Sequence, residues 1–310
     1  MRLFFLTATR VGDAVLSTGL LAALLERHPG ARVTVAAGRP AAPLFRAVPG
    51  LEELIVVDKQ RRGRHWLALW RRIAGRPWGL AVDLRASALT RLIVARRRLI
   101  VPLRAREEEH RVEELGRIAR IAPPPPRLWL TAADHAAAAA LLPAGEDLLA
   151  LAPTANWSGK QWPAERFAAL AERLRGAGAP LAGLRVAVLG AESERAMAAP
   201  LMEALGPAAV DLMGRTELPV AGALLARARL FVGNDSGLMH LAAAAGAPTL
   251  GLFGPTPDRR YAPWGPRAAT VRLRFWDCWR SAGRSRGALV PRSSRGFFSG
   301  CSARGCLAAL

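Results

Sequence analysis

The segment around Asp235 has the residue types of an anion-binding site. Asp235, Ser236 and Gly237 separate an apolar run at 230–232, which has the pattern of a strand, from a run at 238–245 with the pattern of a helix. The N-terminus of a helix presents free backbone N–H groups and a partial positive charge, and both suit a phosphate group. Asp235 and Ser236 could instead only cap the helix, so the pattern leaves two interpretations open.

Other polar residues follow strand-like runs in the same half of the chain. Thr154, Asn156 and Lys160 lie in a loop after the run at 148–152, and Glu192 follows the next such run. The ammonium group of Lys160 could pair with a phosphate, or Lys160 could be an ordinary surface lysine. These positions are candidates for a binding site because open α/β sheets bind ligands at the carboxyl ends of their strands.

The N-terminal half offers a comparable set after its first strand-like run at 3–6. Arg10, Gly12 and Asp13 stand just before a helix predicted over residues 14–28. Asp13 could cap that helix, or it could be a general base directed into a cleft. His240 lies about one turn into the helix that follows Asp235, where a histidine either packs or contacts a ligand.

Alternating strand and helix patterns position these residues. Such alternation predicts parallel sheets joined by right-handed crossovers, and it occurs in two successive series. The strands are predicted at 3–6, 32–36, 54–57, 80–84 and 99–103 in the first series, and at 148–152, 185–189, 210–212, 230–232 and 249–253 in the second. The helices are predicted at 14–28, 43–48, 65–73, 90–95, 132–142, 164–175, 194–205, 219–227 and 238–245. A proline run at 123–126 marks a linker, because proline cannot continue a helix or a central strand. We expect two Rossmann-like domains, 1–145 and 146–270, whose parallel sheets face an interdomain cleft. The dinucleotide fingerprint G-x-G-x-x-G is absent after both first strands, which weighs against a nicotinamide enzyme.

The chain is strongly basic. It has 44 lysine and arginine residues against 24 acidic ones, and only Lys59 and Lys160 are lysines, so the net charge of +20 comes from arginine. This skew can reflect coding bias, yet it also creates a field that attracts phosphates, anionic lipids or nucleic acid. The arginine-rich region 61–120 is therefore either a solvated face or a docking surface for an anionic partner. No RNA-binding signature supports a nucleic-acid partner.

Cysteine usage and hydropathy indicate a cytoplasmic protein. The three cysteines lie near the end of the sequence, and such a sparse, odd set fits a reducing compartment. Their spacing is a poor zinc pattern, so we expect no metal site. No run is long enough for a membrane-spanning helix, and the apolar residues at 3–8 are too few for a signal peptide.

Four segments resemble glycosyltransferase family 9, the bacterial lipopolysaccharide heptosyltransferases. They are residues 10–13 (RVGD), 160–163 (KQWP), 233–240 (GNDSGLMH) and 251–256 (GLFGPT), of which the D-S-G-x-x-H segment with its G-x-F-G-P-T sequel is the most specific. The resemblance is patchy over 3–57, dense over 149–266, and extends to about residue 266. It implies a GT-B architecture with the active site between two Rossmann-like domains.

The resemblance also implies roles. An inverting transferase would move heptose from ADP-heptose to a lipopolysaccharide inner-core acceptor, with no cofactor beyond the nucleotide sugar itself. Asp13 matches the base, Lys160 a cation for the diphosphate, and Glu192 the carboxylate near the ribose. Asp235, Ser236 and Gly237, supported by His240, match the donor site at the helix start; Gly12, Thr154 and Asn156 complete the expected binding set. The open alternatives are another nucleotide sugar or acceptor, or a non-catalytic nucleotide-binding protein.

The expected partners are the nucleotide-sugar donor and a lipid-linked oligosaccharide. We expect a monomer in the cytoplasm with possible peripheral contact at the inner face of the inner membrane. Residues 271–310 differ from the rest of the chain: they hold eight arginines, one acidic residue and all three cysteines, without helix or strand periodicity. This atypical basic segment could be a membrane-contacting tail, an ordered irregular cap, or an out-of-frame reading of a GC-rich gene end.

Overall fold

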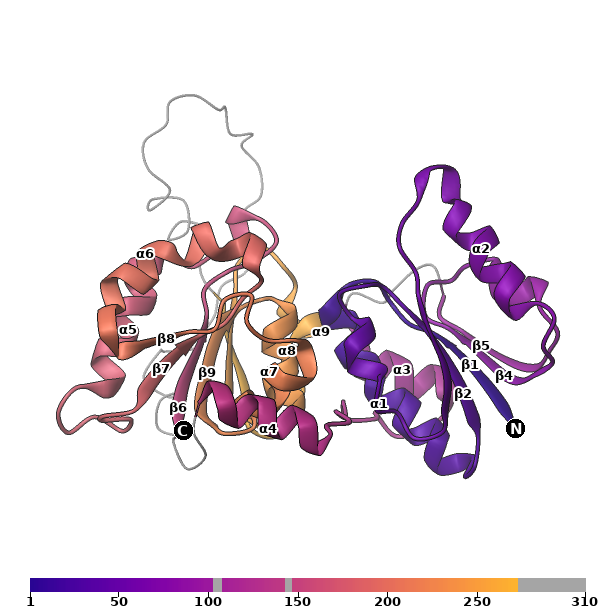
Figure 1. The fold of residues 1–310 in the computed structure, drawn as a ribbon, viewed down its shortest axis with the longest axis horizontal. Helices are drawn as coiled ribbons and strands as arrows, with labels where there is room; N and C mark the ends of the chain where they lie inside the picture. The colour runs from indigo at the N-terminus through magenta and orange to yellow at the C-terminus, as the bar shows by residue number, and fades with distance from the viewer. Residues whose placement is uncertain (103–107, 143–146, 273–310) are drawn as a thin grey trace.

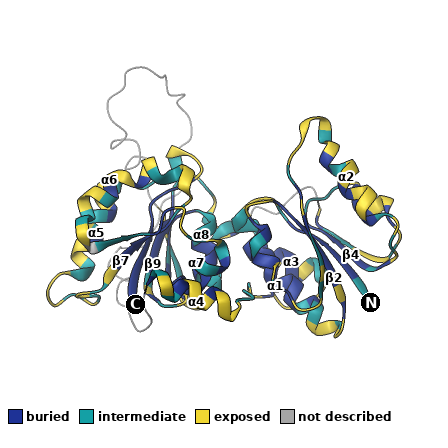
Figure 2. Ribbon diagram, in the orientation of Figure 1, coloured by how far each residue is buried: buried dark blue, intermediate teal, exposed yellow. Residues whose placement is uncertain are grey.

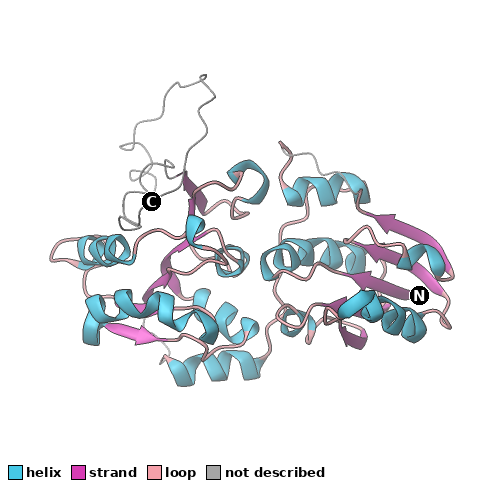
Figure 3. Cartoon of the chain, turned by 90° about the horizontal axis from the view of Figure 1, so that it is seen from above, coloured by secondary structure: helices cyan, strands magenta, loops and turns pink. Residues whose placement is uncertain are grey.

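The structure is a computed structural model that describes residues 1–102, 108–142 and 147–272. These residues form two α/β units that stand side by side, as the view from above shows (Figure 3). The three cysteines, and nearly all of the basic segment at 271–310, lie outside the described residues.

The first unit contains a five-stranded sheet in which every pairing is parallel. Its strand order is β3-β2-β1-β4-β5. The strands are β1 (Arg2–Leu6), β2 (Arg32–Ala37), β3 (Leu51–Val56), β4 (Trp78–Asp83) and β5 (Ala95–Ile100). The helices are α1 (Val11–Arg27), α2 (Arg64–Ile73) and α3 (Arg111–Ala119), with short 3₁₀ turns at Ala42–Phe45 (η1), Arg61–Gly63 (η2) and Leu89–Leu92 (η3).

The second unit contains a six-stranded sheet, also parallel throughout. Its order is β11-β10-β9-β6-β7-β8. The strands are β6 (Leu148–Ala152), β7 (Arg185–Val188), β8 (Ala209–Asp211), β9 (Ala228–Asn234), β10 (Thr249–Phe253) and β11 (Ala268–Arg272). The helices are α4 (Ala132–Leu141), α5 (Ala164–Arg175), α6 (Arg195–Leu205), α7 (Leu218–Leu225), α8 (Gly237–Ala244) and α9 (Asp258–Tyr261), with 3₁₀ turns at Ser158–Lys160 (η4), Glu192–Glu194 (η5) and Gly206–Ala208 (η6).

Helix α1 lies at the junction of the two units and is buried along most of its length (Figure 2). It packs on the core of the first sheet and against α3 and α8, so it needs apolar residues around most of its circumference. Two polar side chains in it are also buried and paired internally: Ser17 donates to the carbonyl of Ala14 at 2.7 Å, and Thr18 donates to that of Val15 at 2.7 Å. The outward faces of α2, α5 and α6 are exposed by contrast (Figure 2).

The proline run joins the units as an extended segment. Residues 123–131 have no helix or strand, and they pass so close to α1 that a Cβ on Gly19 would lie 2.3 Å from the carbonyl oxygens of Pro124 and Pro125. Helix α4, which follows, packs against α7 of the second unit. The boundary predicted at 145/146 stays a prediction, and this packing favours a passage between the units before α4.

Several predicted elements need correction. The helix predicted over 14–28 begins at Val11, which puts Gly12 and Asp13 inside its first turn rather than in the turn before it. The helix predicted over 90–95 is wrong, since η3 and then β5 occupy that region. Strand β5 contains the arginine triplet 96–98, whose exposed polar side chains are tolerated only because β5 is a sheet edge. Helix α3 and strand β11 have no counterpart among the predicted elements.

Candidate active site

A cavity of about 630 Å³ lies between the two units. The first unit lines it with Thr9, Arg10, Val11, Gly12, Asp13 and Pro40. The second unit contributes residues at the carboxyl ends of β6, β7 and β9, residues of α7, α8 and α9, and residues of the loops after β8 and β10. They are Thr154, Ala155, Asn156, Lys160, Gly190, Ala191, Glu194, Thr216, Leu218, Ala221, Asp235, Ser236, Gly237, Leu238, His240, Thr256 and Tyr261. Every predicted site residue except Glu192 lines this one cavity.

The N-termini of α1 and α8 meet at the cavity, because two glycines permit close contact. A Cβ on Gly237 would lie 2.7 Å from the Cβ of Val11, and a Cβ on Gly12 would lie 2.8 Å from Cδ2 of His240. Real Cβ atoms do not approach other atoms this closely, so any larger residue would separate the helices. The contact brings the positive ends of two helix dipoles to one place, an environment that stabilises an anion.

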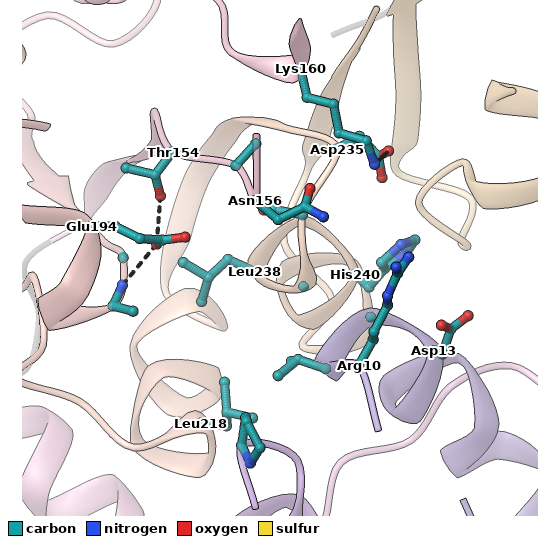
Figure 4. Close-up of a pocket in the computed structure, with 18 of the residues that line it drawn as sticks. Arg10, Asp13, Thr154, Asn156, Lys160, Glu194, Leu218, Asp235, Leu238 and His240 are labelled. Carbon is teal, nitrogen blue, oxygen red and sulfur yellow. Dashed lines mark hydrogen bonds and ion pairs between the residues drawn. The ribbon is translucent and has the colours of Figure 1, made fainter. Parts of the chain in front are cut away.

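Asp13 lies in the first turn of α1 and faces the cavity near Arg10 and His240 (Figure 4). Burial raises the pKa of its carboxyl group above the ordinary value of 3.8, while the positive charges of Arg111, Arg10 and Arg260 oppose that rise. Within the described ranges no side chain donates a hydrogen bond to this carboxylate. A partly desolvated carboxylate of this kind is suited to accept a proton from a bound hydroxyl group.

Lys160 and Asp235 form an ion pair on the opposite side of the cavity. The Nζ of Lys160 lies 2.6 Å from Oδ2 of Asp235, and both side chains are largely buried (Figure 4). Of the two interpretations that the sequence leaves open, the cap does not hold for Asp235, because its carboxylate is directed to Lys160. Ser236 does not cap α8 either, and its buried Oγ has no hydrogen-bond partner among the described residues. A hydroxyl group and a helix start without a side-chain cap favour the anion-site interpretation over the simple cap.

The loop that carries Lys160 is held by Asn234, a residue that the sequence did not single out. Asn234 is fully buried at the end of β9. Its Oδ1 accepts from the backbone N–H of Trp162 at 3.0 Å, and its Nδ2 donates to the carbonyl of Pro153 at 2.7 Å. Both ends of the loop 153–162 are thus fixed to the end of β9, directly before Asp235. An asparagine directly before Asp235 was the only signal in the sequence.

The assignment of Glu192 needs correction. Its carboxylate pairs with the guanidinium of Arg195 at 2.9 Å and 3.0 Å, its side chain is 67% exposed, and it does not line the cavity. Glu194 lines the cavity instead. One of its carboxylate oxygens accepts from Thr154 Oγ1 at 2.8 Å and from the backbone N–H of Ala191 at 3.0 Å (Figure 4). The two glutamates are two residues apart in a 3₁₀ turn, so the sequence identified the turn but not which carboxylate enters the cavity.

His240 is buried in α8, with its ring against Gly12. Burial lowers the pKa of His240 to about 4, and the nearby carboxylate of Asp235 only partly offsets this, so the ring is neutral at neutral pH. Its Nδ1 has no hydrogen-bond partner in the described part of the chain. The histidine is therefore a neutral packing element of the α1–α8 contact, with polar edges near the cavity.

A buried ion cluster connects the units beside the cavity. Glu114 of α3 is fully buried and accepts from Arg111 of the same helix and from Arg260 of α9, the latter at 2.8 Å. His110, which caps α3, also reaches the second unit, where its Nε2 lies 3.0 Å from the carbonyl oxygen of Ala262. These contacts hold α3 and α9 together, and Arg111 and Arg260 are two of the three arginines whose charge acts on Asp13. The pattern of the sequence contained no signal for this cluster.

Comparison with known proteins identifies the family. The family model described as "Glycosyltransferase family 9 (heptosyltransferase)" matches residues 119–285, more than half of the chain. The chain belongs to glycosyltransferase family 9. This match begins before the dense resemblance at 149–266 and continues past residue 266 into the atypical basic segment.

The first curated relatives align with less than half of the chain. The chain is 36% identical over 118 residues to lipooligosaccharide heptosyltransferase 2 of Haemophilus influenzae, an alignment that covers 37% of this chain and 33% of that protein. The alignments to the first curated relatives span 33% to 37% of their length.

Two solved structures of Escherichia coli proteins share the fold. One is ADP-heptose LPS heptosyltransferase II, with a TM-score of 0.72 and 24% identity, covering 91% of this chain and 95% of that one. The other is heptosyltransferase WaaC with ADP, with a TM-score of 0.70 and 18% identity, covering 91% and 96%. The two parallel sheets with a cavity between them are the GT-B architecture, as the sequence predicted.

Proposed function

We propose that this chain is an inverting glycosyltransferase that moves heptose from ADP-heptose to an inner-core acceptor of lipopolysaccharide. The observation that carries the proposal is the placement of Asp13 and the Lys160–Asp235–Ser236 group on opposite units, facing one cavity. Family membership supports the reaction class. The names of the relatives, which include heptosyltransferases acting in lipopolysaccharide synthesis and a structure with ADP, support the donor and the acceptor.

In the proposed reaction the acceptor hydroxyl oxygen attacks the anomeric carbon of the donor sugar. The bond from that carbon to the diphosphate oxygen breaks, and its electron pair goes to the diphosphate. Asp13 accepts the hydroxyl proton. Because base and leaving group lie on opposite units, the attack is in line and inverts the anomeric centre.

The departing diphosphate gains negative charge, which Lys160 and the first turn of α8 are placed to stabilise. Lys160 would exchange part of its pairing with Asp235 for the phosphate. Gly12, Gly237 and His240 keep the two helix starts in contact around the reacting atoms. Closure of the units around the donor would complete the site.

The nucleoside would lie toward the other end of the cavity. There Glu194, held by Thr154, can accept hydrogen bonds from ribose hydroxyl groups, a role that the sequence had given to Glu192. Leu218, Ala221 and Leu238 form an apolar wall that suits a planar base. Asn156 is placed to contact the sugar or the phosphate from the loop after β6.

We further propose that the protein acts in the cytoplasm at the inner face of the inner membrane, because its acceptor would be lipid-linked. We also propose that it acts as a monomer. No helix of the described residues is long and apolar enough to cross a membrane.

A thermal-shift screen against ADP-, UDP-, GDP- and CMP-sugars tests the donor, with selective stabilisation by ADP-heptose expected. Asp13→Asn should then lose about 10²- to 10⁴-fold in turnover while it still binds the donor, because it removes only the proton acceptor. Unchanged turnover would refute the assignment of the base. Donor binding without any turnover in the wild-type chain would favour a non-catalytic nucleotide-binding protein.

A further inference from the structure

Four large apolar side chains are exposed together at one corner of the first unit. Leu67 and Trp70 of α2 are 50% and 37% exposed. Leu92, the last residue of η3, and Val94, just before β5, are 66% and 68% exposed. The last two values are the highest among the exposed large hydrophobic residues of the described chain. A group of this kind on a surface indicates an interaction site, whereas a single exposed leucine does not.

The four side chains are held in place by the fold. The indole Nε1 of Trp70 donates to the carbonyl of Leu92 at 2.9 Å, which ties α2 to the segment before β5. Ile93 is buried in the core under α2, and because side chains alternate along an extended segment, its neighbours Leu92 and Val94 both point outward. The apolar group is therefore a built feature of the surface.

Unpaired arginines accompany the apolar group. Arg71 shares a helix face with Leu67 and Trp70, since these residues are spaced i, i+3, i+4, while Arg91 and Arg96 flank Leu92 and Val94 in the chain. All three arginines are exposed, and within the described residues none has a carboxylate partner. Their neighbours differ: Arg72 pairs with Glu53, and Arg98 donates to three backbone carbonyls.

The surrounding sequence adds to this charge. Residues 59–102 contain twelve basic residues against one acidic residue, Asp83, a net +11 of the chain's +20. Asp83 does not offset the field at the surface, because it is fully buried and accepts hydrogen bonds from Ser87 and Thr90. Glu53 pairs with Arg72 and Arg76 beside α2, so the charge that this corner presents around the apolar side chains is predominantly, though not entirely, positive.

We propose that Leu67, Trp70, Leu92 and Val94 with Arg71, Arg91 and Arg96, here named the α2–β5 patch, dock this protein on an anionic phospholipid bilayer. The proposal rests on the proposed function in one respect, namely that a lipid-linked acceptor requires the enzyme to work at a membrane surface. A bilayer supplies both chemistries of the patch: lipid phosphates pair with the guanidinium groups, and the interfacial region accepts the apolar side chains and the tryptophan. The charged side chains of the patch all carry one sign, which suits the surface of an anionic bilayer.

Vesicle co-sedimentation of the full chain tests the proposal. Wild-type protein should bind phosphatidylcholine vesicles containing about one third phosphatidylglycerol at low salt, and should bind pure phosphatidylcholine far less. Each arginine near an anionic surface contributes roughly fivefold, so Arg71→Gln/Arg91→Gln/Arg96→Gln should weaken partitioning by about 100-fold. Leu92→Ser/Val94→Ser should weaken it by about tenfold, with a larger share of the residual binding lost in high salt.

The matched control removes the same charge elsewhere. Arg166, Arg173 and Arg259 are exposed on the second unit, and their triple replacement by glutamine should leave binding within about twofold of wild type. Equal losses in the patch and control triples would overturn the proposal, because they would mean that net charge alone drives binding. Wild-type protein that ignores anionic vesicles, or that instead self-associates through the patch, would also overturn it.

The experiments distinguish a failure of the docking proposal for the α2–β5 patch from a failure of the proposed transferase function. The vesicle assay contains no nucleotide sugar, and the patch residues lie outside the cavity. The patch variants should retain the thermal shift with ADP-heptose and turnover on a delipidated, water-soluble acceptor. Retention of these properties also shows that the variants are folded.

Discussion

Gly237→Ala is the substitution for which the structure makes the sharpest prediction. The new Cβ would lie 2.7 Å from both Cβ and Cγ1 of Val11, whereas ordinary contacts begin at 3.4 Å. Val11 is β-branched and its Cβ is fixed to the backbone, so rotation of the side chain cannot relieve the contact. The helices α1 and α8 must therefore separate by about 0.7 Å, the difference of the two distances.

That separation acts on the reaction because α1 carries Asp13 and α8 begins beside Ser236. A displacement near 1 Å of reacting groups can cost about 100-fold in rate, so kcat should fall by about 10- to 100-fold. Overpacking at a tight contact costs about 1–3 kcal/mol, so the melting temperature should also fall. The assay is kcat with saturating donor and acceptor, together with thermal melting of the same preparation.

One glycine substitution is a control for this experiment, and another is a second test of the same helix contact. Gly75→Ala makes the same chemical change where nothing lies within 4 Å, and it should leave both measurements near wild type. Gly12→Ala meets Cδ2 of His240 at 2.8 Å from the opposite helix, so it should reproduce the loss of kcat without altering the backbone of the donor site. Wild-type kcat in both Gly12→Ala and Gly237→Ala would refute the claim that the helix contact positions the reacting groups.

Three further measurements test separate parts of the site. Glu194→Gln should weaken binding of the nucleoside diphosphate by about tenfold in calorimetry, because a carboxylate accepts stronger hydrogen bonds than an amide. Glu192→Gln should bind the nucleoside diphosphate like wild type. Weaker binding by Glu192→Gln than by Glu194→Gln would restore the prediction from sequence. As the pH is lowered, the wild-type kcat/KM should fall with an apparent pKa above 3.8, because burial raises the pKa of Asp13 and only its ionised form accepts a proton. If this acid limb of the pH profile lies at or below 3.8, the burial argument is contradicted. Glu114→Gln removes the negative charge between Arg111 and Arg260, so their positive charge should lower the pKa of Asp13 further and the acid limb should move to lower pH. The same substitution should cost about 3–5 kcal/mol of stability. An acid limb that does not move, or that moves to higher pH, would contradict an action of these arginines on Asp13.

The sequence determined the order of elements and most of the site. Runs of apolar residues separated by turn residues predicted the strands β1, β2, β4, β6, β7, β9 and β10, because buried parallel strands are apolar on both faces. Local chemistry also marked the candidate residues, since Asp13, Lys160 and Asp235 each follow a strand, where parallel sheets collect their ligand-binding groups. The motifs at 160–163 and 233–240 predicted the family before any fold was known.

Only the tertiary structure decided what each polar side chain contacts. Asp235 had the sequence context of a helix cap, yet it pairs with Lys160, which is 75 residues away. Glu192 and Glu194 occupy one short turn, and the direction of that turn relative to β6 places Glu194 rather than Glu192 beside Thr154. Strand β5 was missed in part because its arginines break the apolar pattern, which an edge position permits.

The contact between the two units was likewise decided by the tertiary structure and not by the sequence pattern. Gly12 and Gly237 stand at the starts of two helices, where the sequence predicts only turns or close ligand approach. Their role as the surfaces on which α1 meets α8 depends on how the two sheets are placed, and that placement is set by the packing of α1 and by the ion cluster around Glu114. Spacing along a chain fixes the local geometry of a helix or a strand, but a contact across 100 residues or more is the sum of many packing energies that no single segment contains. For this protein the sequence supplied the groups of the proposed transferase site, and the packing of the two units decided which of them face one cavity.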